Sequence, residues 1–168
     1  LDCVSDPGGR FQSVVAPVLP EVDVLFANDF EVEKLTGLTL GRGETLRREA
    51  VVEAGRLLLR RGVREWVVVH CPEGACACGV NGETIWQPSV RMPAAEIAGT
   101  AGAGDALAAG VLMVLHDGGA MEAGLKLGVC AAAASLRHAT CSEALEMAAA
   151  CLGLGARFGF YEAFRENL

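Results

Sequence analysis

The apolar residues of this chain follow two patterns, short uninterrupted runs and longer runs with a helical repeat. Runs rich in β-branched residues at 22–27 and 64–70 predict buried strands. Between them, from 44 to 61, apolar residues recur every four positions and Gly62 follows, which predicts an amphipathic helix. Because strands alternate with helices, we expect an α/β layered sheet of parallel strands joined by right-handed crossovers.

Turn and cap signals divide the rest of the chain. Asn81-Gly82 lies between two short apolar runs and is a strong signal for a two-residue hairpin loop. Asn28 precedes the run "DFEVEKLT", and Gly37 follows it, which predicts a helix with both ends marked. Further helices are predicted over 105–116, 120–137 and 142–151.

The composition indicates a folded chain without nucleic-acid or membrane partners. With 168 residues, 52% of them hydrophobic and 21% charged, the chain predicts one globular domain over 1–168. It has no uncharged apolar run of about 18 residues, so no membrane span is expected. The net charge of −7 argues against a nucleic-acid surface, although backbone amides can still bind an anion locally. The opening "LDCVSDP" resembles the end of a buried strand and suggests part of a longer protein.

Seven cysteines are an odd number, and a chain of this length needs no disulfides. They predict reduced thiols and a cytoplasmic protein. His70, Cys71, Cys76 and Cys78 raise the alternative of a metal or redox site. Their spacing matches no common zinc pattern, and a C-x-C on one strand points both thiols to the same face. Small core residues are therefore the favoured interpretation.

The stretch "GTAGAGDALAAG" at 99–110 carries the clearest chemistry. Gly102 and Gly104 permit a sharp turn and a close approach of backbone to ligand. The first amides of the following helix have no intrahelical acceptor, and with the helix dipole they favour an anion such as phosphate. The same dipole favours the ionised form of Asp105. A carboxylate base beside an anion site suits phosphoryl transfer to a hydroxyl.

Two familiar glycine motifs do not fit this stretch. A Walker A loop needs Lys and Ser or Thr after its last glycine, whereas Asp105 and Ala106 follow Gly104. The dinucleotide fingerprint read from Gly102 needs Gly or Ala where Leu107 stands, which disfavours a hydride-transfer enzyme. A helix entry whose Asp105 is only a terminal charge remains the structural alternative.

A second candidate stretch is "NDFE" at 28–31. Taken alone, it is a capping box in which Asn28 and Glu31 satisfy each other's amides. In the functional interpretation, Glu31 lies at the carboxyl end of a strand, near a magnesium–phosphate complex, because open α/β sheets bind ligands at that edge.

"NDFEVEKLTG" followed by "GTAGAGDALAAGVL" resembles the C-terminal portion of the ribokinase-like (PfkB-type) carbohydrate and nucleoside kinases. That family has an N-x-x-E motif and a late D-T-x-G-A-G-D signature, and the resemblance covers nearly the whole chain. It implies a ribokinase-like layered sheet of mainly parallel strands flanked by helices, with the lid absent. It also implies ATP-dependent phosphotransfer to a hydroxyl of a sugar, a nucleoside or a related small molecule.

The resemblance assigns roles to individual residues. Asp105 would be the base that activates the substrate hydroxyl, and Glu31 would face Mg²⁺. The remaining positions would contact the nucleotide: Gly102, Ala103 and Gly104 as the anion hole for the γ-phosphate, Asn28 beside the Mg·ATP phosphates, Gly74 at the end of a loop along the nucleotide, and Val129, in the segment 129–135, beside the adenine.

Four positions depart from the family pattern. Gly99 replaces an acid that in many members helps to hold a monovalent cation, which leaves potassium activation in doubt. Ala101 stands where Thr is frequent, and Cys71 replaces the first glycine of the nucleotide loop. Gly8, in "DPGGR", replaces the Asn of an early D-P-N-x-R segment.

The family places most sugar-contacting residues and the lid in its N-terminal half. We therefore expect residues 1–168 alone to have little or no sugar kinase activity. The family also implies a homodimer for the whole protein, through lid strands. A nucleotide-binding regulatory module that has lost catalysis is the alternative; Gly99 and Cys71 favour it, and the retained Asp105 argues against it.

Overall fold

The computed structural model describes residues 1–3 and 8–162. Contacts within the chain separate it into two compact units. The sheet unit comprises Leu1–Pro72 and Cys76–Ile85, and the helical unit comprises Glu73–Ala75 and Trp86–Leu168. In the "DPGGR" stretch, Asp6 lies outside the described residues.

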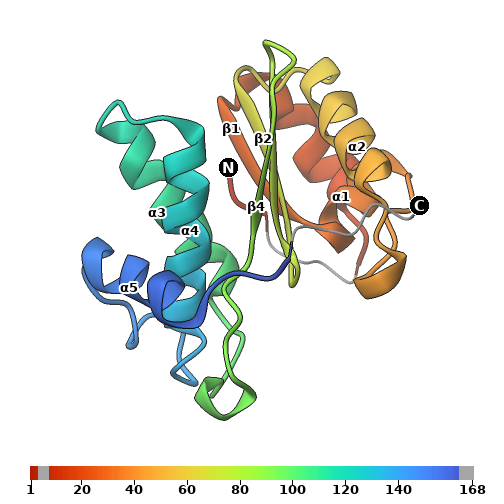
Figure 1. The fold of residues 1–168 in the computed structure, drawn as a ribbon. Coiled ribbons are helices and arrows are strands. Elements are labelled where there is room, and N and C mark those ends of the chain that lie inside the picture. The colour runs from red at the N-terminus through yellow and green to blue at the C-terminus, as the bar shows by residue number, and fades with distance from the viewer. Residues whose placement is uncertain (4–7, 163–168) are drawn as a thin grey trace. The chain divides into compact units, whose positions relative to one another are not determined.

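Four strands form one sheet in the order β1-β2-β3-β4 (Figure 1). β1 pairs in parallel with β2, in a register that runs from Val24 opposite Trp66 to Asn28 opposite His70. Only two residues join β2 to β3, so these neighbours run antiparallel and the sheet is mixed. The strands are β1 (Val24–Asn28), β2 (Trp66–Cys71), β3 (Gly74–Gly79) and β4 (Thr84–Pro88). Both strands predicted from apolar runs are confirmed.

The opening residues extend this pairing. Asp2 forms a parallel bridge to Phe26. The Cys3 amide donates to the Phe26 carbonyl at 3.2 Å, and the Phe26 amide donates to the Leu1 carbonyl at 2.8 Å. The strand-like character expected of the first residues is thus present over Leu1–Cys3, beside β1.

Two α-helices pack on β1 and β2 (Figure 1). α1 (Asp29–Thr36) ends at Gly37, which adopts a φ of +79°, as the sequence predicts. α2 (Arg48–Arg60) begins four residues after the predicted start at Glu44. Arg47 is extended there, and its amide donates to the Leu40 carbonyl at 2.9 Å, so the helix cannot start earlier. The short helical segments of this unit are η1 (Phe11–Val15), η2 (Ala16–Glu21) and η3 (Gly43–Thr45).

The hairpin between β3 and β4 is confirmed, but its loop is longer than predicted. The Gly79 amide donates to the Glu83 carbonyl at 2.9 Å, which leaves three residues in the loop instead of two. Gly82 takes a φ of +90°, typical of a type I turn followed by a left-handed residue. The Asn81 side chain accepts from the Glu83 amide at 3.0 Å and stabilises this form.

Three helices build most of the helical unit (Figure 1). α3 and α4 pack closely where two glycines meet, since a Cβ on Gly110 would lie 2.8 Å from the Gly128 Cα. After α5, Phe160 bridges Val90 in antiparallel fashion. The helices are η4 (Ala94–Glu96), α3 (Ala103–His116), α4 (Met121–Ser135) and α5 (Ala148–Phe158).

The last helix differs from its prediction at both ends. The sequence predicts 142–151, whereas α5 begins at Ala148, after Met147 in an extended conformation. The helix also continues past the predicted end at residue 151 to Phe158, and two glycines lie within it. A Cβ on Gly155 would lie 3.0 Å from the Cys130 Sγ on α4, so this glycine allows close packing between helices.

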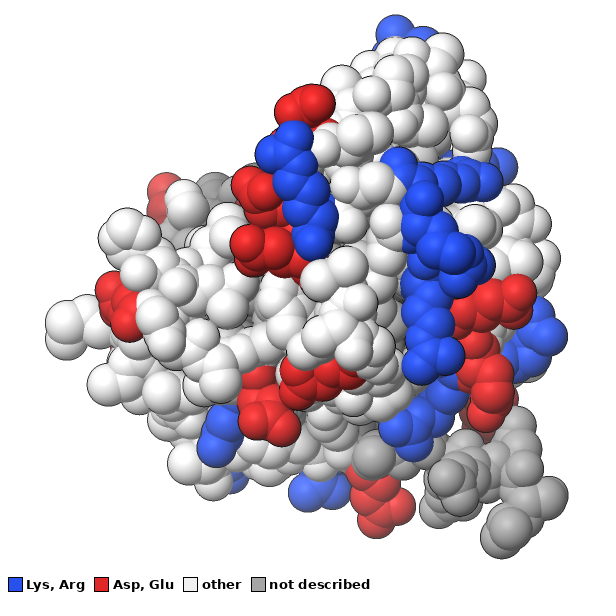
Figure 2. Space-filling model, turned by 90° about the horizontal axis from the view of Figure 1, so that it is seen from above, with Lys and Arg blue, Asp and Glu red and all other residues white. Residues whose placement is uncertain are grey.

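Charged side chains of both signs mix on the surface. Figure 2 shows one face of the molecule, on which Lys and Arg side chains form a band and Asp and Glu side chains lie in separate groups. Near the end of α2, Arg64 pairs with Glu21 at 2.5 Å and with Asp23 at 3.6 Å. Within residues 1–3 and 8–162, no helix is long and apolar enough to cross a membrane.

Candidate active site

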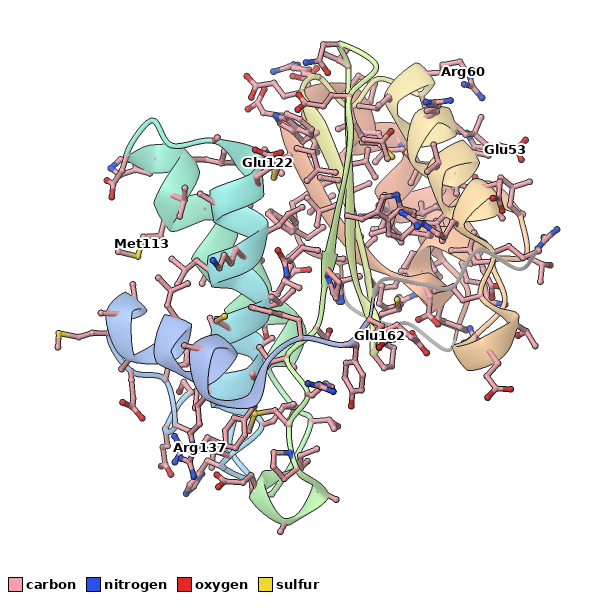
Figure 3. All side chains as sticks on the ribbon, in the orientation of Figure 1. Glu53, Arg60, Met113, Glu122, Arg137 and Glu162 are labelled. Atoms are coloured by element: carbon pink, nitrogen blue, oxygen red, sulfur yellow. The ribbon has the colours of Figure 1, made fainter. Side chains whose placement is uncertain are left out.

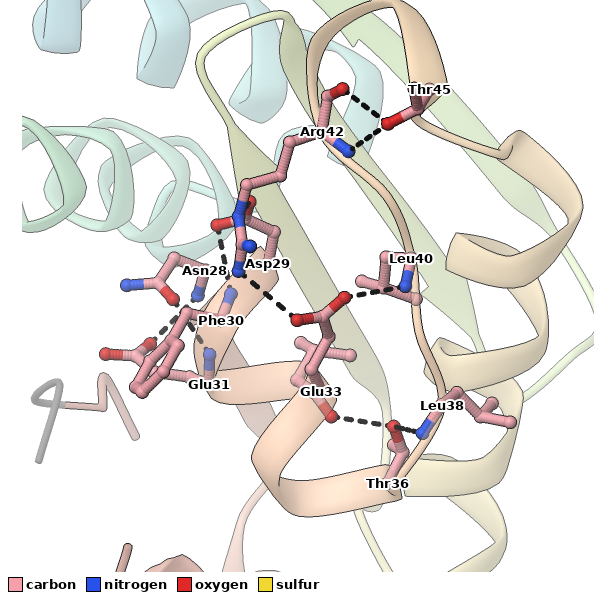
Figure 4. Close-up of polar contacts among 11 residues, drawn as sticks. Asn28, Asp29, Phe30, Glu31, Glu33, Thr36, Leu38, Leu40, Arg42 and Thr45 are labelled. Carbon is pink, nitrogen blue, oxygen red and sulfur yellow. Dashed lines mark hydrogen bonds and ion pairs between the residues drawn. The ribbon is translucent and has the colours of Figure 1, made fainter. Parts of the chain in front are cut away.

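The first part of the candidate site is the junction of β1 and α1 (Figure 4). Asn28 ends β1 and caps α1, because its Oδ1 accepts from the Glu31 amide at 2.9 Å. The Glu31 Oε2 accepts from the Asn28 amide, also at 2.9 Å. This is the reciprocal capping box that the sequence predicts. It fixes both side chains at the carboxyl end of a strand.

Glu31 is unusual because it is a charged residue with only 2% of its surface exposed. A buried carboxylate is costly unless it is paired or hydrogen-bonded, and the capping box supplies one such bond. Burial raises the pKa of the neighbouring Cys3 thiol to about 12, and the charges of Glu31 and Asp2 add to this effect. Carboxylate oxygens are the ligands that Mg²⁺ prefers, but the Glu31 Oε2 already accepts from the Asn28 amide, and the metal-facing role of Glu31 stays a prediction.

An arginine that the sequence analysis did not single out supports this junction. The Arg42 Nε lies 2.9 Å from the Asp29 Oδ2, and its Nη2 lies 3.2 Å from the Glu33 Oε2 (Figure 4). Glu33 also accepts from the Leu40 amide at 2.8 Å. These contacts hold residues 40–42, which follow α1, against the helix. In the sequence, only the acids at alternating positions in "DFEVE" hint that a basic side chain pairs with this helix.

The second part of the candidate site is the glycine turn, residues 99–102, together with the start of α3. Gly102 takes the left-handed conformation, with a φ of +79°, and no side chain caps the helix there. α3 begins at Ala103, two residues before the predicted start, so Ala103 and Gly104 belong to its first turn. Asp105 is exposed on the same turn. Both residues belong to the turn whose amides have no acceptor within the helix, although the Ala103 amide donates to the Thr100 carbonyl in the glycine turn at 3.4 Å.

Gly99 stands where the family pattern has an acidic ligand for a monovalent cation. A Cβ built on this residue would lie 3.1 Å from the Ala139 Cα and 3.3 Å from the His138 carbonyl oxygen. Gly99 has no carboxylate to offer, and a larger side chain would displace the backbone of residues 138 and 139. The residues present here therefore do not fit the acidic cation ligand of the family.

The other two positions assigned to the nucleotide lie within the backbone framework. Gly74 starts β3 with a φ of +159°, and a Cβ there would lie 2.5 Å from the Gln87 carbonyl oxygen on β4. Close packing between two strands therefore explains this glycine. Val129 lies in the middle of α4, and 2% of its surface is exposed. Their nucleotide roles stay predictions.

The candidate residues thus form two groups, each held within one unit. Asn28 and Glu31 lie together in the sheet unit, and Gly102 to Asp105 lie together in the helical unit. The structure gives no comparable group around the cysteines. Among the described residues there is no set of three His, Cys, Asp or Glu side chains that could hold a metal.

The cysteines of β3 are buried, as expected of core residues. The pKa values of the Cys76 and Cys78 thiols depend on the interaction between the two thiols and on their burial. That interaction, with burial, raises the pKa of Cys76, while it lowers the pKa of Cys78. Both thiols lie on one face of the strand, in agreement with the C-x-C spacing.

Comparison with known proteins agrees with the two motifs. The family model of the pfkB family carbohydrate kinases matches residues 1–148. A ribokinase from Arabidopsis thaliana is 32% identical over 133 residues, which cover 79% of this chain and 33% of that protein.

Solved structures show the same fold. One is the Arabidopsis thaliana ribokinase complexed with ribose and ATP (TM-score 0.71, 24% identity, 83% of this chain and 42% of that chain). Another, from E. coli, is assigned as a ribokinase II in complex with ATP and Mg²⁺ (TM-score 0.75, 17% identity, 93% and 47%). The chain spans less than half the length of these relatives. With a ribokinase-like α/β fold and a family match over most of its residues, the chain belongs to the pfkB family of carbohydrate kinases.

Proposed function

We propose that this chain supplies the phosphotransfer part of an ATP-dependent kinase that acts on a hydroxyl of a sugar or related small molecule. The observation that carries the proposal is the position of Asp105, an exposed carboxylate on the first turn of α3. The helix begins directly after the left-handed Gly102, and no side chain caps it. A base and a set of helix amides are thus presented on the same turn. Phosphoryl transfer to an alcohol requires both.

In the proposed reaction, the substrate hydroxyl oxygen attacks the γ-phosphorus of ATP, and its proton passes to the Asp105 carboxylate. The bond between the γ-phosphorus and the β,γ-bridging oxygen breaks, and ADP leaves. The amides of Ala103 and Gly104 donate to the phosphoryl oxygens, whose charge the helix dipole also stabilises. When bound, Mg²⁺ neutralises phosphate charge, and Glu31 is the residue we expect to face it.

The relatives support the choice of nucleotide. The Arabidopsis thaliana ribokinase structure contains ribose and ATP, and the E. coli structure contains ATP and Mg²⁺. We infer the same cofactors for this chain, with Asn28 beside the phosphates, Gly74 along the nucleotide and Val129 toward the adenine. The acceptor remains a sugar or a nucleoside. Because no acidic ligand fits at Gly99, the proposed reaction includes no monovalent cation.

Substitution of Asp105 tests the proposal. In the whole protein that the gene encodes, Asp105→Asn should lower kcat by about 10²- to 10⁴-fold, the usual contribution of a positioned base. Mg·ATP affinity, measured by calorimetry, should change much less. Asp117→Asn is the matched control, because Asp117 is an exposed acid at the opposite end of the same helix. We expect residues 1–168 alone to have little or no sugar kinase activity.

Two results would count against this function. Equal kcat values for Asp105→Asn and the unsubstituted protein would remove Asp105 from its role as base. Tight Mg·ATP binding without turnover on any sugar or nucleoside, in the whole protein, would instead favour a regulatory nucleotide-binding module.

A further inference from the structure

The glycine turn of α3 is supported by a second segment, Arg137–Cys141, which we call the bracing segment. It begins after Leu136, the C-cap residue of α4, and lies against residues 98–102. The Ala98 amide donates to the Leu136 carbonyl at 2.8 Å, and the Gly99 amide donates to the same carbonyl at 3.3 Å. These bonds join Ala98 and Gly99, the first residue of the turn, to Leu136, which immediately precedes the bracing segment.

The contact becomes closest at Gly102. A Cβ built on Gly102 would lie 2.7 Å from the Cα, the Cβ and the carbonyl oxygen of Cys141. Together with the contact between Gly99 and Ala139, this places backbone against backbone at both ends of the turn. The turn needs such support, because its glycines have broad conformational freedom and α3 has no side-chain cap.

Arg137, which is labelled in Figure 3, forms ion pairs with the segments on both sides of the bracing segment. Its Nε lies 3.4 Å from the Glu96 Oε2, in η4 just before the turn. Its Nη1 lies 3.4 Å from the Glu146 Oε1, just before α5. About two thirds of the Arg137 and Glu96 side chains are covered, since 34% and 29% of them are exposed. One guanidinium thus joins the two chain segments that flank the contact.

The bracing segment also holds its own shape. The His138 Nδ1 lies 2.9 Å from the Thr140 Oγ1, and it accepts from the Thr140 amide at 3.2 Å. The segment therefore presents Ala139 and Cys141 to the turn as a closed loop, with Arg137 at its base.

We propose that the bracing segment fixes the glycine turn and so orients Asp105, and that Arg137 is a positioning residue for the reaction. This inference rests on the proposed function, because it needs Asp105 to be the base. Both ion pairs of Arg137 are long, at 3.4 Å, and about a third of its side chain is exposed, so we expect them to contribute little to global stability. Small displacements of a catalytic group, in contrast, lower the rate strongly.

Three variants of the whole protein test Arg137. Arg137→Gln removes both ion pairs, and Arg137→Lys keeps the charge but loses the planar fork that reaches two carboxylates. Arg157→Gln is the matched control, since Arg157 lies 3.7 Å from the same Glu96 but belongs to α5. Hydrogen exchange of the backbone amides is measured for each variant, along with kcat, the KM for Mg·ATP and the melting temperature.

We expect Arg137→Gln to speed hydrogen exchange at residues 98–105 and 138–141 and to lower kcat by about tenfold to hundredfold. The melting temperature and the KM for Mg·ATP should change little. Arg137→Lys should recover part of the loss, and Arg157→Gln should behave like the unsubstituted protein.

Unchanged exchange at residues 98–105 in Arg137→Gln would overturn the bracing role. Faster exchange with an unchanged kcat would overturn the positioning role. Because exchange does not depend on catalysis, these outcomes differ from a failure of the proposed function, which would appear as full activity in Asp105→Asn.

Discussion

Both ends of α3 are marked by a glycine in the left-handed conformation, but only the first is packed against other chain segments. Gly102 and Gly118 have φ values of +79° and +75°. A Cβ on Gly102 would meet Cys141 at 2.7 Å, whereas nothing lies within 4 Å of a Cβ on Gly118. Alanine substitutions at Gly102 and Gly118 therefore separate the free-energy cost of a left-handed backbone from the cost of a steric clash with Cys141.

We expect Gly118→Ala to lower the free energy of unfolding by about 1–2 kcal/mol, the usual penalty for a left-handed residue with a Cβ. Gly102→Ala should cost at least about 1 kcal/mol more, because the new methyl group also displaces Cys141. Urea unfolding of both variants gives the comparison. Equal losses would mean that the bracing segment moves freely away from the turn.

Sequence reasoning at the level of single residues was most successful where the chemistry is local. The capping box of Asn28 and Glu31 spans four consecutive residues, and both of its hydrogen bonds are present. Asp105 stands out because an acid follows a glycine-rich turn. Arg137 gave no such signal, since its partner Glu96 is distant in the chain and any arginine on a surface has the same local pattern.

At the scale of single elements, α1 depends on its cap. Asn28→Ala removes the side-chain acceptor of the Glu31 amide and should lower the free energy of unfolding by about 0.5–2 kcal/mol. Asn28→Ser is the control, because serine also caps helices and keeps a side-chain acceptor without adding a charge beside Glu31. Urea unfolding followed by circular dichroism measures both variants. A loss of stability in Asn28→Ser as large as in Asn28→Ala would show that the lost cap does not cause it.

The helix boundaries show where periodicity is insufficient. The helical repeat begins at residue 44, but a tertiary hydrogen bond from Arg47 to Leu40 delays α2. The last helix was predicted to end at residue 151, whereas α5 runs to Phe158, and within that extension Gly155 packs against Phe160 and against Cys130 of α4. In both cases a contact with another segment outweighed local preference, and such contacts cannot be seen in the local pattern.

At the scale of the whole molecule, order and spacing of the motifs were sufficient to predict the family and its α/β fold. The strand pairing was predicted less fully, because β2, β3 and β4 follow one another through short turns and form the antiparallel part of a mixed sheet. A four-residue apolar repeat and a strand signal do not specify which neighbour a strand will pair with.

The whole molecule should also work without a monovalent cation. Because Gly99 packs against Ala139 and carries no carboxylate, we expect kcat and Mg·ATP affinity to agree within about twofold between potassium chloride and choline chloride at equal ionic strength. Steady-state assays and calorimetry of the whole protein measure both quantities. Activation by potassium that sodium and choline do not reproduce would contradict this expectation.

The position of Gly74 has a consequence for evolutionary comparison. A carbonyl oxygen of the neighbouring strand occupies the space that a side chain would need, so selection on strand spacing alone would keep glycine there. A descendant that lost its catalytic activity would retain this residue for as long as it kept its sheet. Glycine at position 74 in related sequences is therefore expected to mark the fold, whether or not a relative keeps the activity proposed for Asp105.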